Sequence, residues 1–191
     1  MNYPQFWLQA SPKLKRLYST LFVLLLAILA TVAGTFVQLP PQEAQAIYDQ
    51  LNQTTTSPGL LQNIFINNFP LCLLMFIPLV GIGVGLFILF STGMAFRAVF
   101  DIQAASGLTS SAAASDLTAS TAILMLIAVG AVFVLEYVSY TIAMTESVWL
   151  FRRILQKRWG EFKIAAALIG LVALLLIIGA IVEAFAITAS L

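Results

Sequence analysis

Long runs without a charged side chain constrain this sequence more than any other feature. Residues 17–37 contain no charged residue, and the other apolar runs are of similar length. A helix needs about 20 apolar residues to cross the hydrocarbon core of a bilayer. Only 9% of the residues are charged, against about 25% in a typical soluble domain. The composition therefore indicates an integral helical membrane protein and excludes a soluble enzyme, a nucleic-acid-binding protein and a disordered chain.

Side chains that hold metals or catalyse acid–base chemistry are scarce in this chain. The 191 residues include no histidine and one cysteine, Cys72. Histidine is the commonest metal ligand and acid–base residue, and a single cysteine cannot form an internal disulfide. The sequence also contains no phosphate-binding loop, no cysteine-rich metal spacing and no Ser/His/Asp arrangement. We therefore expect no metal, no cofactor and no enzymatic activity.

The apolar runs predict a single all-α integral membrane domain over residues 1–191, with about five membrane segments. These segments are residues 17–37, 61–79, 82–100, 117–149 and 164–189. Pro40 and Pro41 end the first segment, because proline interrupts a helix. The outer loop, 38–60, carries a pattern typical of a short amphipathic helix at the membrane surface. A second outer loop, 101–116, predicts a flexible connection or a weak helix.

Basic residues predict how the segments are oriented. Eight of the nine fall in two blocks, which are Lys13, Lys15 and Arg16, and then Arg152, Arg153, Lys157, Arg158 and Lys163. Basic residues near segment ends favour the cytoplasmic side, which places the N-terminus in the cytoplasm and the C-terminus outside the cell membrane. The second block is expected to contact anionic headgroups of the bilayer. Four aromatic residues surround it, as expected at a membrane interface, namely Trp149, Phe151, Trp159 and Phe162.

The run from residue 60 to residue 100 must return to the side of the membrane that it left, because the loops before and after it, 38–60 and 101–116, are both predicted to lie outside. Its 41 residues would make about 60 Å of helix, which two spans of about 30 Å use completely. We therefore predict that the second and third segments form a short glycine-rich hairpin. Gly81 and Gly85 stand near its middle and suit a tight turn or a close helix crossing. Together with Gly93, they are the candidate helix-packing residues.

One carboxylate, Glu136, stands near the middle of the fourth segment. Ser139 and Tyr140 follow at three and four residues and share its helical face. An intramembrane charge costs about 2.5 kcal/mol or more, so Glu136 is either a structural group bonded to another helix or part of an ion, proton or substrate path. Asn67 and Asn68, at the start of the second segment, are candidates for a cap or for a bond between helices.

The other charged residues near the membrane have simpler expected roles. Glu146 is expected near the cytoplasmic interface, solvated or paired close to residues 152–153. Arg97 has Asp101 four residues on, where the two side chains can pair. Glu183 is expected near the outer end of the last segment, within reach of water.

Three stretches together carry a resemblance to a known family. They are Glu43-Ala-Gln-Ala-Ile47; Ile64-Phe-Ile-Asn-Asn68 with Ser91-Thr-Gly93; and Leu135-Glu-Tyr137 leading into Ser139-Tyr-Thr-Ile-Ala143. On these residues the chain resembles the stage II sporulation protein M family, in the form of its archaeal members. The resemblance implies a polytopic cell-membrane protein with family positions at Asn67, Asn68, Gly93 and Glu136. The family's namesake anchors cell-wall remodelling enzymes in spore-forming bacteria.

Two functional hypotheses follow from these features. The first is a non-enzymatic membrane scaffold or accessory subunit, bound within the bilayer to another membrane protein or to a second copy of itself. The second is a small transporter or permease component with Glu136 in a polar intramembrane site. A transporter predicts a water-accessible cavity that reaches Glu136. Oxygens of Glu136 that bond only to a neighbouring helix would count against it.

Overall fold

The computed structural model describes residues 10–56, 58–105, 119–158, 160 and 162–190, and within these residues all regular structure is helical. The helices are α2 (Pro12–Thr35), α3 (Pro41–Thr56), α4 (Leu60–Met75), α5 (Gly81–Ala105), α6 (Ala119–Leu155) and α7 (Phe162–Ser190). The prediction of an all-helical chain is therefore confirmed for this part of the protein. Most of the predicted second outer loop, together with Trp159, lies outside the described residues.

Four of the helices are long and apolar enough to cross a membrane, namely α2, α5, α6 and α7. This is the pattern of a multi-pass membrane protein. Helix α4 is equally apolar in character but has only 16 residues. The start of α2 is well specified locally: Ser11 accepts a hydrogen bond from the backbone N–H of Leu14, and Pro12 occupies the first turn.

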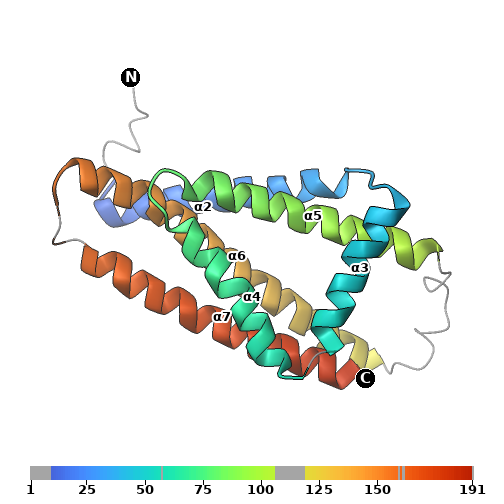
Figure 1. The fold of residues 1–191 in the computed structure, drawn as a ribbon. Coiled ribbons are helices and arrows are strands. Elements are labelled where there is room, and N and C mark those ends of the chain that lie inside the picture. Colours follow the sequence, from blue (N-terminus) through green and yellow to red (C-terminus); the bar gives the residue numbers. More distant parts are fainter. Residues whose placement is uncertain (1–9, 57, 106–118, 159, 161, 191) are drawn as a thin grey trace.

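The two basic blocks of the sequence lie at one end of the helix bundle. Helices α2, α5 and α7 begin at this end, whereas α4 and α6 finish there (Figure 1). The guanidinium groups of Arg16 and Arg152 both lie over the ring of Trp149, at 5.4 and 5.2 Å from its centroid. We call this the basic end of the bundle. The positive-inside rule requires the two blocks to lie on the same side of a membrane, and the fold places them at the same end of the bundle.

Helix α3 lies across the opposite end of the bundle and connects α2 to α4 (Figure 1). It packs against α5 and against α4. Ala44 is buried, whereas Glu43 is exposed, as in an amphipathic helix. The outer loop predicted over 38–60 thus contains a helix, and this helix occupies most of its length.

The connection between α4 and α5 differs from the prediction of a glycine turn. The chain turns over residues 76–80, where Leu79 has a φ of 71°. Gly81 and Gly85 belong instead to the first turns of α5, where both are buried. A single residue in the left-handed region is enough to reverse the chain. Helix α5 then continues to Ala105, five residues beyond the predicted end of the third segment.

Candidate functional site

An interhelical hydrogen bond joins α4 to α6 at the acid that the sequence singled out. The Nδ2 of Asn68 donates to the Oε1 of Glu136 at 2.7 Å. Both side chains are half-buried, whereas that of Asn67 is exposed on the other side of α4. The neighbouring asparagines therefore have different environments: one ties two helices together, and the other faces away from the bundle.

The hydroxyl groups near Glu136 are mostly satisfied within α6 itself. Ser139 Oγ donates to the carbonyl of Leu135 at 2.8 Å, and Thr141 Oγ1 donates to the carbonyl of Tyr137 at 2.8 Å. Ser139 and Tyr140 are both buried. Bonds of this kind, back to the preceding turn, let a helix carry hydroxyls in an apolar setting.

A second hydrogen bond between helices connects α2 to α6. The hydroxyls of Thr31 and Tyr137 lie 2.5 Å apart, and both side chains are buried. Thr31 donates its hydroxyl proton to the carbonyl of Ala27. The hydroxyl of Tyr137 is therefore the donor between the two side chains, because a threonine hydroxyl has one proton to give.

A second acid, Glu183 of α7, lies close enough to Glu136 for their charges to interact. Helices α6 and α7 pack together in opposite directions. Along their helices, Glu136 and Glu183 stand about 29 and about 32 Å from the ends that meet at the basic end. Glu183 lies toward the C-terminal end of α7 and is half-buried. Depth measured from the basic end would have placed the two acids at the same level.

Two glycines allow α2 and α5 to approach closely at the far end of the bundle. A Cβ on Gly93 would lie 2.0 Å from the carbonyl oxygen of Thr31, and one on Gly34 would lie 2.0 Å from that of Phe90. The α carbons of the two glycines face each other across the crossing. Gly93, predicted to pack against a helix, packs against α2, and Gly34 is the partner that the sequence reasoning missed.

The other candidate packing glycines bring α5 onto α6 and, at Gly81, onto the carbonyl of Met75 at the end of α4. A Cβ on Gly81 would lie 2.7 Å from the Cβ of Ser147, and one on Gly85 would lie 2.3 Å from the sulfur of Met144. Gly83, on the opposite side of α5, has nothing within 4 Å of an added Cβ. The GxxxG pattern therefore serves packing within this chain, the alternative favoured over a seam between two copies.

The predicted surface cluster of basic residues contains one member that is buried. Arg153 Nη1 bonds to Glu146 Oε1, and both side chains are 3% exposed. The remaining members of the cluster are exposed, namely Arg152, Lys157, Arg158 and Lys163. Arg153 thus belongs to an internal ion pair, because a spacing of seven residues places it on the face of Glu146. At the far end, Arg97 and Asp101 pair at 2.8 Å, as their spacing predicts.

Among the residues that the structure describes, no group of three or more His, Cys, Asp or Glu side chains is placed to hold a metal ion. The comparisons with known proteins find no match, neither a protein-family model nor a curated protein nor a solved structure. The polar side chains of this site connect α2, α4 and α6 through hydrogen bonds.

Proposed function

We propose that this protein is a non-enzymatic membrane scaffold or accessory subunit that binds another membrane protein through the outward face of α4. The observation that carries the proposal is that Asn67 and Asn68, although adjacent in α4, have different environments. Asn68 is engaged by Glu136 inside the bundle, whereas Asn67 is exposed and makes no side-chain hydrogen bond within the described part of the chain. Its amide stands at nearly the depth of Glu136.

An amide at that depth needs a hydrogen-bonding partner. Hydrocarbon offers none, and an unsatisfied polar group there costs several kcal/mol. A polar side chain on a partner helix would satisfy the amide, and bonds of this kind between membrane helices contribute about 0.6 kcal/mol on average. The neighbouring exposed residues are apolar, among them Ile66 and Leu74, and suit packing against such a helix.

The topology that accompanies this proposal has five membrane segments, with α4 as a short and tilted crossing. The basic end faces the cytoplasm, following the positive-inside rule. The N-terminus is then cytoplasmic, α3 lies on the outer surface and the C-terminus is outside. The resemblance to the stage II sporulation protein M family supports the same architecture. In this reading the cell membrane is the location, and the family positions Asn68 and Glu136 form the tie between α4 and α6.

The experiment is affinity purification from native membranes, followed by mass spectrometry of the co-purifying chains. Asn67→Leu is compared with Ile66→Leu, because both place leucine on the exposed face of α4 and only the first removes an amide. We expect the wild type and Ile66→Leu to retain a membrane partner that Asn67→Leu loses. A wild-type protein that purifies alone would contradict the proposal, and so would a partner retained equally by both variants. If the retained chain is a second copy of this protein, the scaffold is a homo-oligomer instead.

A second candidate function, a small transporter component, is favoured by one specific observation. Glu136 and Glu183 lie within electrostatic range at the same depth, on adjacent helices. Paired acids inside a membrane are typical of ion and proton paths. The bond from Asn68 favours the structural role, because it engages one of the oxygens of Glu136 with a neighbouring helix.

Proton flux into vesicles distinguishes the two functions. The protein is reconstituted with a pH-sensitive dye inside, and an imposed pH difference drives the flux. A transporter would lose flux in Glu136→Gln, which can still accept the bond from Asn68 but cannot titrate. We expect the wild type and Glu136→Gln to give the same flux as empty vesicles. A wild-type flux above that level, removed by Glu136→Gln, would favour the transporter.

A further inference from the structure

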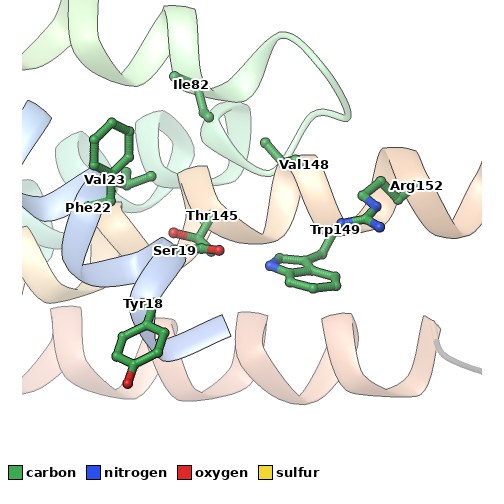
Figure 2. A pocket seen from close by; sticks show the side chains of 9 residues that line it. All are labelled: Tyr18, Ser19, Phe22, Val23, Ile82, Thr145, Val148, Trp149 and Arg152. Atoms are coloured by element: carbon green, nitrogen blue, oxygen red, sulfur yellow. The ribbon is translucent and has the colours of Figure 1, made fainter. Parts of the chain in front are cut away.

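A cavity of about 330 Å³ opens between α2, α5 and α6, apart from the polar site described above. Its lining changes character along its length (Figure 2). Phe22 and Val23 lie at one end of the cavity, and Trp149 and Arg152 lie at the other. The cavity is thus apolar toward the middle of the bundle and cationic and aromatic toward the basic end.

Thr145 places an unsatisfied hydroxyl on the wall of this cavity. The residue is 5% exposed, and its Oγ1 has no hydrogen-bond partner among the described residues. Other hydroxyls of the bundle do have partners: Ser19, also on the cavity wall, donates to the carbonyl of Lys15 at 2.8 Å. A buried hydroxyl without a partner costs about 1–3 kcal/mol. An occupant that offers an acceptor oxygen at this point would remove that cost.

Positive charge is concentrated at the mouth of the cavity. Arg152 is exposed, and its guanidinium lies 5.2 Å from the centroid of the Trp149 ring. Arg16 of α2 contacts the same ring. Guanidinium groups match phosphate geometry well, and tryptophan is enriched at the level of lipid headgroups.

We propose that this cavity binds one anionic phospholipid from the leaflet at the basic end. Its phosphate lies between Arg152 and Arg16, an oxygen of its glycerol region accepts the hydroxyl proton of Thr145, and one acyl chain packs against Phe22 and Val23. Each part of the lipid then meets the matching part of the lining. The bilayer supplies this ligand at high local concentration, since the cavity lies beside the chain's own membrane segments.

Native mass spectrometry of the delipidated protein tests the proposal. It is titrated with dioleoylphosphatidylglycerol, with the zwitterionic dioleoylphosphatidylcholine and with glycerol 3-phosphate. We expect one phosphatidylglycerol to bind at least about tenfold more tightly than phosphatidylcholine, because both lipids carry the phosphate but the quaternary ammonium of phosphatidylcholine adds a positive charge close to Arg152 and Arg16. Glycerol 3-phosphate is expected not to bind, because it lacks the acyl chain.

Three variants locate the bound lipid. Thr145→Val removes the hydroxyl with little change of shape, Arg152→Gln removes the charge, and Ser19→Phe fills the cavity while leaving the arginines in place. The first two should weaken phosphatidylglycerol binding about tenfold, and the third should abolish it. Lys163→Gln is the matched control, because Lys163 is a nearby exposed cation outside the cavity.

Several outcomes would overturn the proposal. Equal binding of the two phospholipids would show that the cavity does not select a lipid of net negative charge. Binding of glycerol 3-phosphate as tight as that of phosphatidylglycerol would make the ligand a soluble phosphate ester. Unchanged lipid binding in Ser19→Phe would place the lipid elsewhere on the surface. If Arg152→Gln does not fold, Thr145→Val and Ser19→Phe still decide. Protection of the buried thiol of Cys72 reports folding for each variant.

Discussion

Replacing Gly93 by alanine perturbs the closest backbone approach between α2 and α5. The added Cβ would lie 2.0 Å from the carbonyl oxygen of Thr31 and 3.0 Å from the α carbon of Gly34. Real Cβ atoms keep at least 3.0 Å from such neighbours, so the two helices must separate by about 1 Å. Both contacts are backbone atoms, which no side-chain rotation can move.

The expected cost of Gly93→Ala follows from this geometry. Overpacking a well-packed interface costs about 1–3 kcal/mol, and a clash between backbones belongs at the upper end. For a chain of this length, 3 kcal/mol corresponds to a fall in Tm of about 6–12 °C. The single cysteine supplies the assay, because Cys72 is fully buried in the fold. A thiol-reactive fluorophore in mild detergent therefore reports unfolding as the temperature rises.

Gly83→Ala is the matched control for this measurement. Gly83 lies in the same helix, and an added Cβ there meets nothing within 4 Å. Alanine is also the better helix former, by about 1 kcal/mol, so Tm should stay the same or rise. If Gly93→Ala melts at the temperature of Gly83→Ala, the close crossing of α2 and α5 is refuted.

Two further perturbations concern the buried polar pairs. Glu146→Gln should destabilise the fold by about 3–5 kcal/mol, because the charge of Arg153 stays buried without its carboxylate. The double variant with Arg153→Met should recover most of that loss by the same thermal assay; a double variant as unstable as the single one would contradict this. Tyr137→Phe should lower stability by about 1 kcal/mol and should add almost nothing in a Thr31→Val background, because both changes remove one hydrogen bond. Additive losses would show that the two hydroxyls act separately.

Several parts of the site could be predicted because they depend on short-range spacing. Arg97 and Asp101 pair at a spacing of four residues, as a helix requires. Glu136 was singled out because a carboxylate within an apolar run is costly wherever that run folds. That it bonds to Asn68 could not be predicted, since 68 residues separate them and no periodicity relates one segment to another.

Other parts of the site could not be predicted, because they depend on how the helices are aligned against one another. Glu183 and Glu136 stand at similar distances from the basic end because α6 and α7 pack together in opposite directions. Gly34 meets Gly93 because α2 and α5 run side by side in the same direction. Arg153 is buried, unlike the other basic residues of its block, because its face of α6 points into the bundle. None of these relations is encoded in a window of adjacent residues.

The sequence by itself determined that the chain is helical, that its long apolar helices suit a membrane, and that the two blocks holding eight of its nine basic residues must lie at one end. These properties follow from solvation, which acts on each residue or segment separately. The tertiary structure alone decided which of two neighbouring asparagines ties α4 to Glu136, which arginine is buried, and which residue with a buried, unpartnered hydroxyl lines a cavity. Those outcomes depend on the rotation and register of packed helices. Close packing sets both through contacts between residues far apart in the chain.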